Sequence, residues 1–398
     1  MPSQQPAGSR RYGFRTRKYV TMRVLISAGE ASGEMYGAQL IEALRRRVPD
    51  LECFGVGGER MHAAGCDIVV NSKELAVVGI TEILPRVPRI YAEFRKLVRT
   101  MDERRPDAGI VIDSPAFNFR VARELHRRGV PVVYYVAPQL WAWRERRVRF
   151  MRYVKKALVI FPFEERWYRE RGVDAEFVGH PLAGLPKPTI SREEFAREYG
   201  LDAQRQWIAL LPGSRRKEVG MNLPAMLGAG QRFPKYQLIL PVASTLDAHW
   251  VEKQVRQHGG SVTLVHDARA AIAHSRAAVV ASGTATVEAA LMGTPMVVVY
   301  RVSPLTWLFG RPLVKVKHFA MVNLVAGREI VPELIQANFT ADTVAARLAE
   351  VLADGPAREK MIQGLEEVCT RLRAEGSVRP AAERAADAVL RTSGLATV

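Results

Sequence analysis

The sequence predicts an α/β protein made of two Rossmann-like, doubly wound domains that face a cleft. Three observations support this prediction. The chain has 398 residues, which exceeds the usual size of a single core. Short β-branched runs alternate with amphipathic segments, as they do in βαβ units. A proline-rich break at 181–191 separates two such series, which indicates two units in tandem.

The first series contains four apolar runs that we expect to form buried parallel strands: RVLISA, GIVID, VVYYV and ALVIF. The second contains WIALLPGS, QLILPVA, SVTLVH, AAVVAS and PMVVVY. Residues 340–392 carry helix-favouring residues at a helical spacing. We therefore expect a first domain at 23–188 and a second at 189–357, with C-terminal helices of about 358–398 packing back on the first domain.

The composition predicts an ordinary globular protein rather than a membrane-spanning one. Apolar residues make up 48% and charged residues 25% of the chain, and no apolar run is long enough for a membrane span. Residues 1–22 are basic and have no apolar core, so they do not resemble a secretory signal, and we expect a disordered tail. Cys53, Cys66 and Cys369 are few and scattered, which favours neither a disulfide nor a metal site and suggests a cytoplasmic protein.

A formal net charge of +17 predicts an anionic partner, which could be nucleic acid, anionic lipid or a phosphorylated substrate. The runs at 86–105 and 144–156 carry much of this charge, although such runs are often just solvated helix faces. No helix-turn-helix, RNP or zinc-finger signature accompanies them, so we expect no nucleic acid partner.

Ligands of open parallel sheets bind beyond the carboxyl ends of the strands. Four segments there are unusual: SAGEASGE, VIDSPAFN, LLPGSRRKE and VASGTATVEA. In the third, Gly213 permits close backbone approach, Ser214 offers a hydroxyl, and Arg215 can pair with a diphosphate beside a helix N-terminus. An ordinary tight turn is the alternative interpretation.

The fourth segment repeats this pattern, with Ser282, Gly283 and Thr284 at a helix start and Glu288 expected in the first turn. The small hydroxyl residues could cap the helix or bind phosphate. Glu288 could accept hydrogen bonds from ribose hydroxyls, or it could serve only as a partner of the helix dipole. The segment alone does not decide between these roles.

Asp113 follows a buried strand, so its carboxylate is expected to emerge at the strand's end. There it could act as a general base, or it could only cap the following turn. The chain has no His, Cys, Asp or Glu cluster with ligand spacing and no D-x-D pair, so we expect no metal and no cofactor. Arginine and backbone amides would then stabilise a departing diphosphate.

From Met22 onward the chain resembles the lipid A disaccharide synthase family. Nine segments carry the resemblance in order: AGEASGE, ELAVVGITEILPRVPRI, VIDSPAFN, APQLWAWRERRV, FPFEE, FVGHPLA, IALLPGSR, ASGTATVEAAL and NLVAGREIVPELIQ. The chain departs from the family pattern at Ala116, where a second aspartate is usual, and at Glu34, Gly184 and Val322. Ala116 puts the identity of the acceptor in doubt.

The resemblance implies a GT-B fold and an inverting transfer of 2,3-diacylglucosamine from its UDP derivative onto 2,3-diacylglucosamine 1-phosphate. The products would be a β(1→6) disaccharide and UDP. Asp113 matches the aspartate regarded as the general base of the family. The other implied positions are Glu30, Ser32 and Asn118 on the acceptor side, and Arg215, Asn323 and Gln336 on the donor side.

Such lipid substrates imply an enzyme at the cytoplasmic surface of the inner membrane, and a homodimer is compatible with the sequence. We expect a membrane-docking patch of Val78, Ile80, Ile83, Leu84, Arg86 and Arg89. An ordinary core-facing helix is the alternative for this segment. A UDP-sugar 2-epimerase of similar architecture is the competing function, although it would need no apolar, basic surface of this kind.

Overall fold

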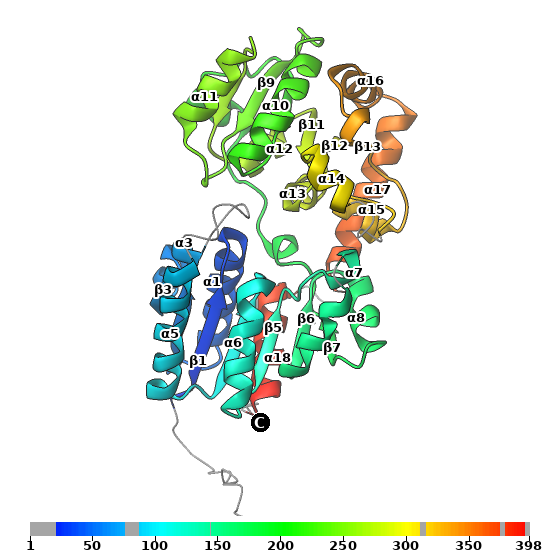
Figure 1. Ribbon diagram of the computed structural model, residues 1–398. Coiled ribbons are helices and arrows are strands. Elements are labelled where there is room, and N and C mark those ends of the chain that lie inside the picture. The colour runs from blue at the N-terminus through cyan, green and yellow to red at the C-terminus, as the bar shows by residue number, and fades with distance from the viewer. Residues whose placement is uncertain (1–20, 76–86, 144, 311–315, 375–378, 395–398) are drawn as a thin grey trace, which may run out of the picture.

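The computed structural model describes residues 21–75, 87–143, 145–310, 316–374 and 379–394. The predicted α/β class is confirmed, because the described chain forms two separate parallel sheets, each flanked by helices (Figure 1). Of the expected disordered tail, residues 1–20 lie outside the described residues, whereas Met22 is buried and its carbonyl accepts a hydrogen bond from the Glu52 amide.

In the described chain the first sheet has seven strands and the second has six, and every strand pair is parallel. In spatial order the first sheet contains β3 (Cys66–Asn71), β2 (Glu52–Gly57), β1 (Arg23–Ala28), β4 (Ala108–Ile112), β5 (Val132–Tyr135), β6 (Lys156–Val159) and β7 (Ala175–Phe177). The second contains β10 (Thr263–Val265), β9 (Gln237–Pro241), β8 (Trp207–Leu211), β11 (Ala277–Ala281), β12 (Met296–Tyr300) and β13 (Glu333–Ile335).

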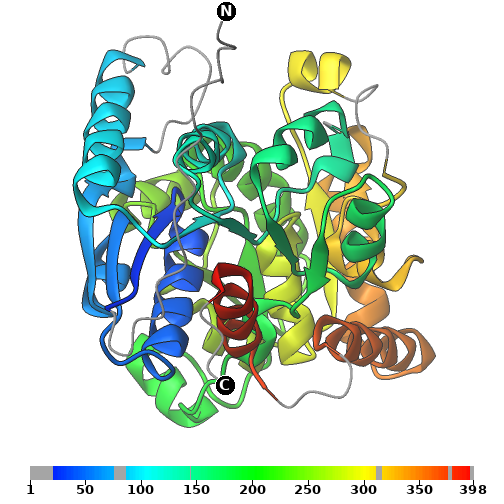
Figure 2. The ribbon, with the colours of Figure 1, turned by 90° about the horizontal axis from the view of Figure 1, so that it is seen from below.

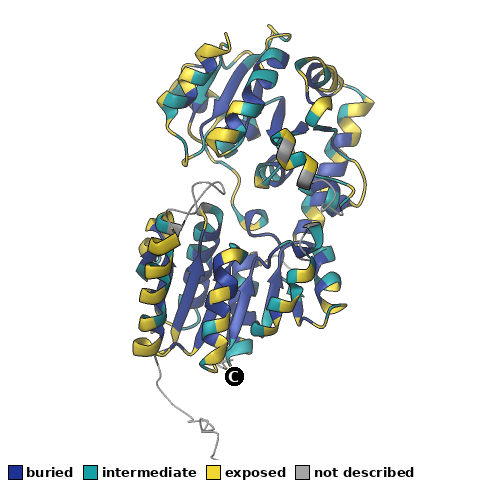
Figure 3. Cartoon of the chain, viewed as in Figure 1, coloured by how far each residue is buried: buried dark blue, intermediate teal, exposed yellow. Residues whose placement is uncertain are grey.

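Helices cover both faces of each sheet, so the central strands are buried on both sides (Figure 3). The helical segments of the first half are α1 (Ala31–Arg45), α2 (Glu59–Ala63), α3 (Ser72–Leu75), α5 (Val87–Arg104), α6 (Pro115–Arg127), α7 (Leu140–Trp143), η2 (Glu145–Tyr153), α8 (Pro162–Arg169) and η3 (Pro181–Gly184). Those of the second half are α9 (Arg192–Tyr199), α10 (Arg216–Gly230), α11 (Ala248–Gln257), α12 (Ala268–His274), α13 (Thr284–Met292), α14 (Pro304–Gly310), α15 (Met321–Ala326), η5 (Gln336–Asn338), α16 (Ala341–Leu352), α17 (Pro356–Leu372) and α18 (Ala381–Ser393).

The two faces of the first sheet have separate cores. Val24 and Ile26 of β1 point into a core that α1 and α18 cover, whereas Leu25 points into a core that α5, α6 and η2 cover. This alternation is the period of two expected of a strand, and it explains why the consecutive residues at 24–26 of β1 are all apolar. Figure 2 shows α18 and α1 on the same side of this sheet.

The two long C-terminal helices pack on different halves. Helix α18 returns to the first sheet and packs against α1, as predicted. Helix α17, which we also expected on the first domain, instead packs against α13, α15 and α16 of the second half. Its buried face contains Leu365 and Val368, and Gly364 leaves room for Ile330, so the apolar face of α17 matches that half.

Cys53 and Cys66 are not scattered in space. They are direct partners in the register of β2 and β3, and their sulfur atoms lie 2.9 Å apart in buried surroundings. Both are free thiols, as is Cys369. Only the strand register brings this pair together, so their separation along the sequence could not indicate it.

Both sheets share one strand order, in which the connection reverses direction beside the first strand of the unit. The reversal lies between β1 and β4 in the first sheet and between β8 and β11 in the second. Ligands of doubly wound sheets bind outside the carboxyl ends of the strands at such a point. The loops that follow these four strands are the four segments that the sequence singled out.

Candidate active site

Asp113 directly follows β4, and its main chain is held in a left-handed conformation with φ of 49°. The Tyr134 hydroxyl donates a hydrogen bond of 2.7 Å to the carbonyl of Asp113, and the Asn118 side chain donates another of 2.7 Å. These bonds fix the backbone that carries the carboxylate. The position of the Asp113 side chain at the end of β4 is thereby set through its own main chain.

Asn118 is fully buried on α6 and faces away from solvent. Its amide nitrogen also bonds the carbonyls of Ile112 and Ser27, and its oxygen accepts from the Ser27 hydroxyl at 2.7 Å. Its side chain thus ties the end of β4 to β1. The predicted acceptor-side residue holds Asp113 in place and has no group directed toward an acceptor in this structure.

The carboxyl group of Asp113 has a raised pKa of about 6, chiefly because burial disfavours its charged form. The negative charge of Glu30 raises it further, whereas a hydrogen bond from the Ser114 amide opposes the change. A carboxylate with this pKa can accept a proton near neutral pH more readily than an ordinary aspartate can. The group is therefore suited to the predicted role of general base.

The loop after β1 lies against the loop after β4. A Cβ atom on Gly29 would lie 2.5 Å from the Ser114 hydroxyl oxygen, so glycine is required for this approach. Glu30 precedes α1 in extended conformation, and its side chain does not cap the helix. Ser32 lies in the first turn of α1 and is partly exposed. Both residues are thus brought to the same strand ends as Asp113.

The loop after β8 makes a tight turn at Gly213 and leads into the N-terminus of α10. Gly213 has φ of 127°, which disfavours other residues, and Arg215 is the N-cap of α10. The Arg215 guanidinium lies 2.9 Å from the Glu218 carboxylate and 3.8 Å from that of Glu30. The contact with Glu30 joins the second half of the molecule to the first.

The loop after β11 begins α13. The Ser282 hydroxyl donates to the carbonyl of Phe319 at 2.7 Å, Gly283 has open space around its α-carbon, and Thr284 is exposed. The helix begins at Thr284, so Glu288 lies in its second turn rather than the first turn that we expected. Glu288 is consequently too far along the helix to be a dipole partner of the N-terminus, and burial is the main reason that its pKa is raised.

The side-chain amides of Asn323 and Gln336 both form hydrogen bonds to other groups of the protein. Asn323 is fully buried, donates to the carbonyl of Val331 and to the Glu333 carboxylate, and accepts from two backbone amides. Gln336 pairs with both backbone groups of Val302, at 2.7 and 3.1 Å. Neither predicted donor-side amide is directed toward open space, so both fix the loops around the site.

Strained backbone is concentrated at these strand ends. Apart from Arg105, the non-glycine residues with positive φ in the described chain are Asp113 (49°), Ser114 (46°), Val136 (54°) and Gln336 (51°). Each follows a strand, and Val136 is β-branched, for which this conformation is a genuine outlier. Such strain costs of order 1 kcal/mol or more per residue and tends to persist at functional sites.

Comparison with known proteins shows to which family the chain belongs. The family model described as lipid-A-disaccharide synthetase matches residues 24–389. The chain belongs to the lipid-A-disaccharide synthetase family. It is 57% identical over 374 residues to the lipid-A-disaccharide synthase of Koribacter versatilis, covering 93% of this chain and 98% of that one. It is 44% identical to the synthase of Myxococcus xanthus, covering 92% and 97%.

Membership of the lipid-A-disaccharide synthetase family makes this chain an enzyme, a glycosyltransferase of lipid A biosynthesis. Solved structures with the same fold include the UDP-GlcNAc 2-epimerase of Neisseria meningitidis, with a TM-score of 0.65, 13% identity and coverage of 93% and 100%. The glycotransferase of kitacinnamycin has a TM-score of 0.64, 17% identity and coverage of 93% and 98%. These likenesses show a fold of the GT-B type, and the family match does not favour the epimerase function.

Three side chains near the candidate site were not singled out from the sequence. Tyr134 supports Asp113 but lies within a run that predicts only a buried strand. Tyr36 is buried on α1, and the charges of Glu288 and Asp113 add to burial in raising its pKa, which places it near carboxylates of both halves. Glu218 follows the N-cap by three residues, a spacing that signals a capping carboxylate and could have identified it.

The predicted membrane patch lies largely outside the described residues, which do not include Val78, Ile80, Ile83, Leu84 and Arg86. Arg89 lies on α5 and pairs with Glu74 at 2.7 Å. On the same helix Val87 and Tyr91 are 47% and 59% exposed, which is unusual for large apolar side chains. No helix among the described residues is long and apolar enough to cross a bilayer.

Proposed function

We propose that this enzyme joins UDP-2,3-diacylglucosamine to 2,3-diacylglucosamine 1-phosphate with inversion, forming a β(1→6) disaccharide 1-phosphate and UDP. Asp113 accepts the proton of the acceptor 6-hydroxyl as its oxygen attacks the anomeric carbon. The Arg215 guanidinium and the amides near Ser214 stabilise the departing diphosphate. Inversion requires these groups to act from opposite sides of one sugar.

The observation that carries this proposal is the contact between Glu30 and Arg215. Their charged atoms lie 3.8 Å apart, although they come from the loops after β1 and β8 in different halves. Glu30 is also close enough to Asp113 to raise its pKa. The contact therefore supports an acceptor-side carboxylate and a donor-side arginine that face a single reaction centre.

The remaining predicted residues divide between contact and support. Gly213, Ser214, Ser282, Gly283 and Thr284 offer exposed or partly exposed loop groups to the nucleotide diphosphate, and Glu288 can accept from the ribose. Asn323 and Gln336 act through the loops that they hold. In this division 189–357 binds the donor, and 23–188 together with α18 binds the acceptor.

We further propose that α5 faces a membrane surface of the kind that carries both lipid substrates. Val87 and Tyr91 are exposed on α5, and the cation of Arg95 lies four residues after Tyr91 and so on the same side of the helix. Apolar side chains flanked by cations are favourable at an anionic interface. Binding to vesicles with and without anionic lipid, measured by co-sedimentation, tests this surface, and equal binding to neutral vesicles would contradict the role of the charges.

Product analysis by mass spectrometry tests the reaction. Purified enzyme with both substrates should yield the disaccharide 1-phosphate, and UDP should be released only when acceptor is present. Proton NMR of the new linkage should show the β configuration. Release of UDP or isomerisation of the sugar without acceptor would instead support epimerase chemistry.

A further inference from the structure

The Glu218 carboxylate pairs with two groups that the proposed function assigns to the diphosphate, the Ser214 amide and the Arg215 guanidinium. One carboxylate oxygen accepts from the Ser214 amide at 3.0 Å, and the other lies 2.9 Å from the terminal nitrogen of Arg215. The same carboxylate would lie 2.5 Å from a Cβ atom on Gly213. It therefore fills the space beside the loop glycine, where the proposed function requires a diphosphate.

We propose that Glu218 is an internal competitor of the donor diphosphate, which must displace its carboxylate from Ser214 and Arg215. This inference rests on the proposed function, because it assumes that the diphosphate binds this loop. A carboxylate and a phosphate accept hydrogen bonds from the same kinds of donor. Both anions cannot use one amide and one guanidinium nitrogen at once, and their charges repel each other.

The shape of the loop does not depend on Glu218. The Asn222 side chain donates to the carbonyl of Pro212 at 2.8 Å, and the Thr245 hydroxyl donates to that of Ser214 at 2.6 Å. These bonds hold the chain on both sides of Gly213. The Glu218 side chain is one-third exposed, so it can rotate toward solvent while the loop keeps its form.

Competition of this kind would also assist the end of the reaction. UDP leaves the loop after transfer, and the carboxylate of Glu218 can then return to Ser214 and Arg215. Its return would replace contacts of the diphosphate with the loop and would thereby favour dissociation of UDP. Glu218 is thus a positioning residue that tunes nucleotide affinity and release, without touching the reacting atoms.

The test compares UDP binding by the full-length enzyme and its Glu218→Gln variant with isothermal titration calorimetry. We expect about tenfold tighter binding of UDP by Glu218→Gln, because the neutral amide competes less well and repels the diphosphate less. The donor KM should fall together with the dissociation constant. The kcat should also fall, because release of UDP becomes slower.

Glu194→Gln is the matched control. Glu194 is likewise the third residue of its helix and accepts from the Ser191 amide at 2.9 Å, but it lies on α9 in a capping box. This control should lower thermal stability without changing UDP affinity. If Glu218 were only a capping residue, Glu218→Gln would behave like it, and unchanged or weaker UDP binding would overturn the inference. Failure of the wild-type enzyme to bind UDP would instead refute the proposed function.

Discussion

At the scale of single residues, Asp113 is the group on which transfer depends most directly. We expect Asp113→Asn to lower kcat by at least about 10²-fold, since proton transfer to a positioned base contributes about that much. UDP affinity should not change. The melting temperature at pH 7 should stay the same or rise slightly, because burial raises the pKa of this carboxyl and its ionised form opposes folding above about pH 6. Steady-state kinetics and calorimetry check this, and retained turnover would exclude Asp113 as the base.

The pKa of Asp113 also predicts the pH dependence. Because the base must be ionised, kcat/KM should fall on the acid side with an apparent pKa near 6. Glu30→Gln removes one of the charges that raise this pKa, so the acid limb should move to lower pH. Burial is the larger cause and remains, so the limb should stay above the usual range of an aspartate. Glu42→Gln, an exposed position on the same helix, serves as the control and should leave the profile in place.

At the scale of elements, the approach of the loops after β1 and β4 depends on Gly29. In Gly29→Ala the new methyl carbon would lie 2.5 Å from the Ser114 oxygen, so the loop that carries Asp113 must move. We expect a loss of about 1 to 3 kcal/mol of stability and a fall in kcat of tenfold or more. Thermal unfolding and turnover measure the two effects.

Gly33→Ala provides the comparison for that prediction. A Cβ atom on Gly33 would meet its nearest neighbours at 3.7 Å, an ordinary van der Waals contact. Since alanine favours helix over glycine by up to about 1 kcal/mol, this variant should be as stable as the wild type or more so. Equal damage from both substitutions would show that the approach to Ser114 is not the cause.

Elements with long apolar runs could be predicted from the sequence, and short or mixed ones could not. All five strands expected in the second half are present. The sixth strand of that sheet, β13, was not predicted, because it has only three residues and carries no periodic signal. Strands β2 and β3 were missed because glycines and single polar residues interrupt their runs. Each half therefore appeared as a βαβ series although some of its strands were not recognised.

The sequence could indicate where a side chain lies when that side chain follows a strand closely. Asp113 and Arg215 could be placed at strand ends in this way, and their roles remain predictions. The inward hydrogen bonds of Asn118 and Gln336 depend on neighbours that are close only in the folded chain, so spacing could not indicate them. The same limit applied to the cysteine pair of β2 and β3.

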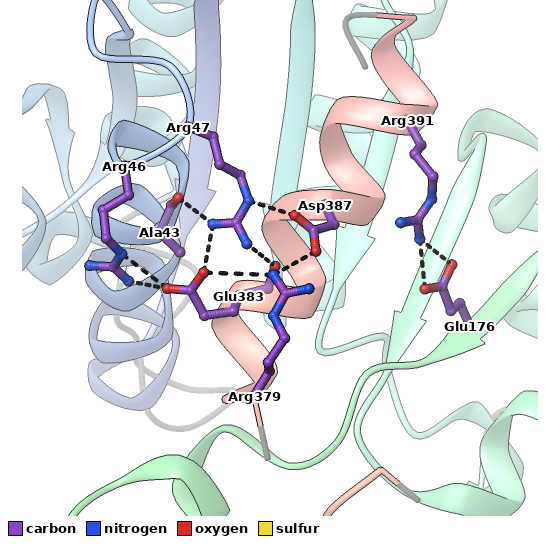
Figure 4. A network of polar contacts seen from close by, with 8 residues as sticks. All are labelled: Ala43, Arg46, Arg47, Glu176, Arg379, Glu383, Asp387 and Arg391. Atoms are coloured by element: carbon purple, nitrogen blue, oxygen red, sulfur yellow. Dashed lines mark hydrogen bonds and ion pairs between the residues drawn. The ribbon is translucent and has the colours of Figure 1, made fainter. Parts of the chain in front are cut away.

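At the scale of the whole molecule, α18 holds the end of the chain on the first half after α17 has packed on the second. Figure 4 shows the ion pairs that fasten it to α1. Arg47 lies 2.5 Å from Asp387 and 2.6 Å from Glu383, and it also donates to the carbonyl of Ala43. Its side chain is only 16% exposed, so these contacts are poorly screened. The attachment joins segments more than 300 residues apart along the chain.

Replacing Arg47 should therefore loosen this attachment. We expect Arg47→Met to lower the free energy of unfolding by about 2 to 3 kcal/mol, since two half-buried carboxylates lose their main partner. Arg46 also pairs with Glu383 but is 59% exposed, so Arg46→Met should cost less than about 1 kcal/mol. Burial is the largest single influence on the pKa of Asp387 and acts to raise it, but the hydrogen bonds and charges of Arg47 and Arg379 together outweigh burial and lower the pKa. That contribution is present at neutral pH and is lost on acidification, so the difference between wild type and Arg47→Met should shrink below about pH 4. Denaturant unfolding at pH 7 and pH 3.5 measures it, and a difference that is equal at both values would mean that Arg47 acts through packing rather than charge.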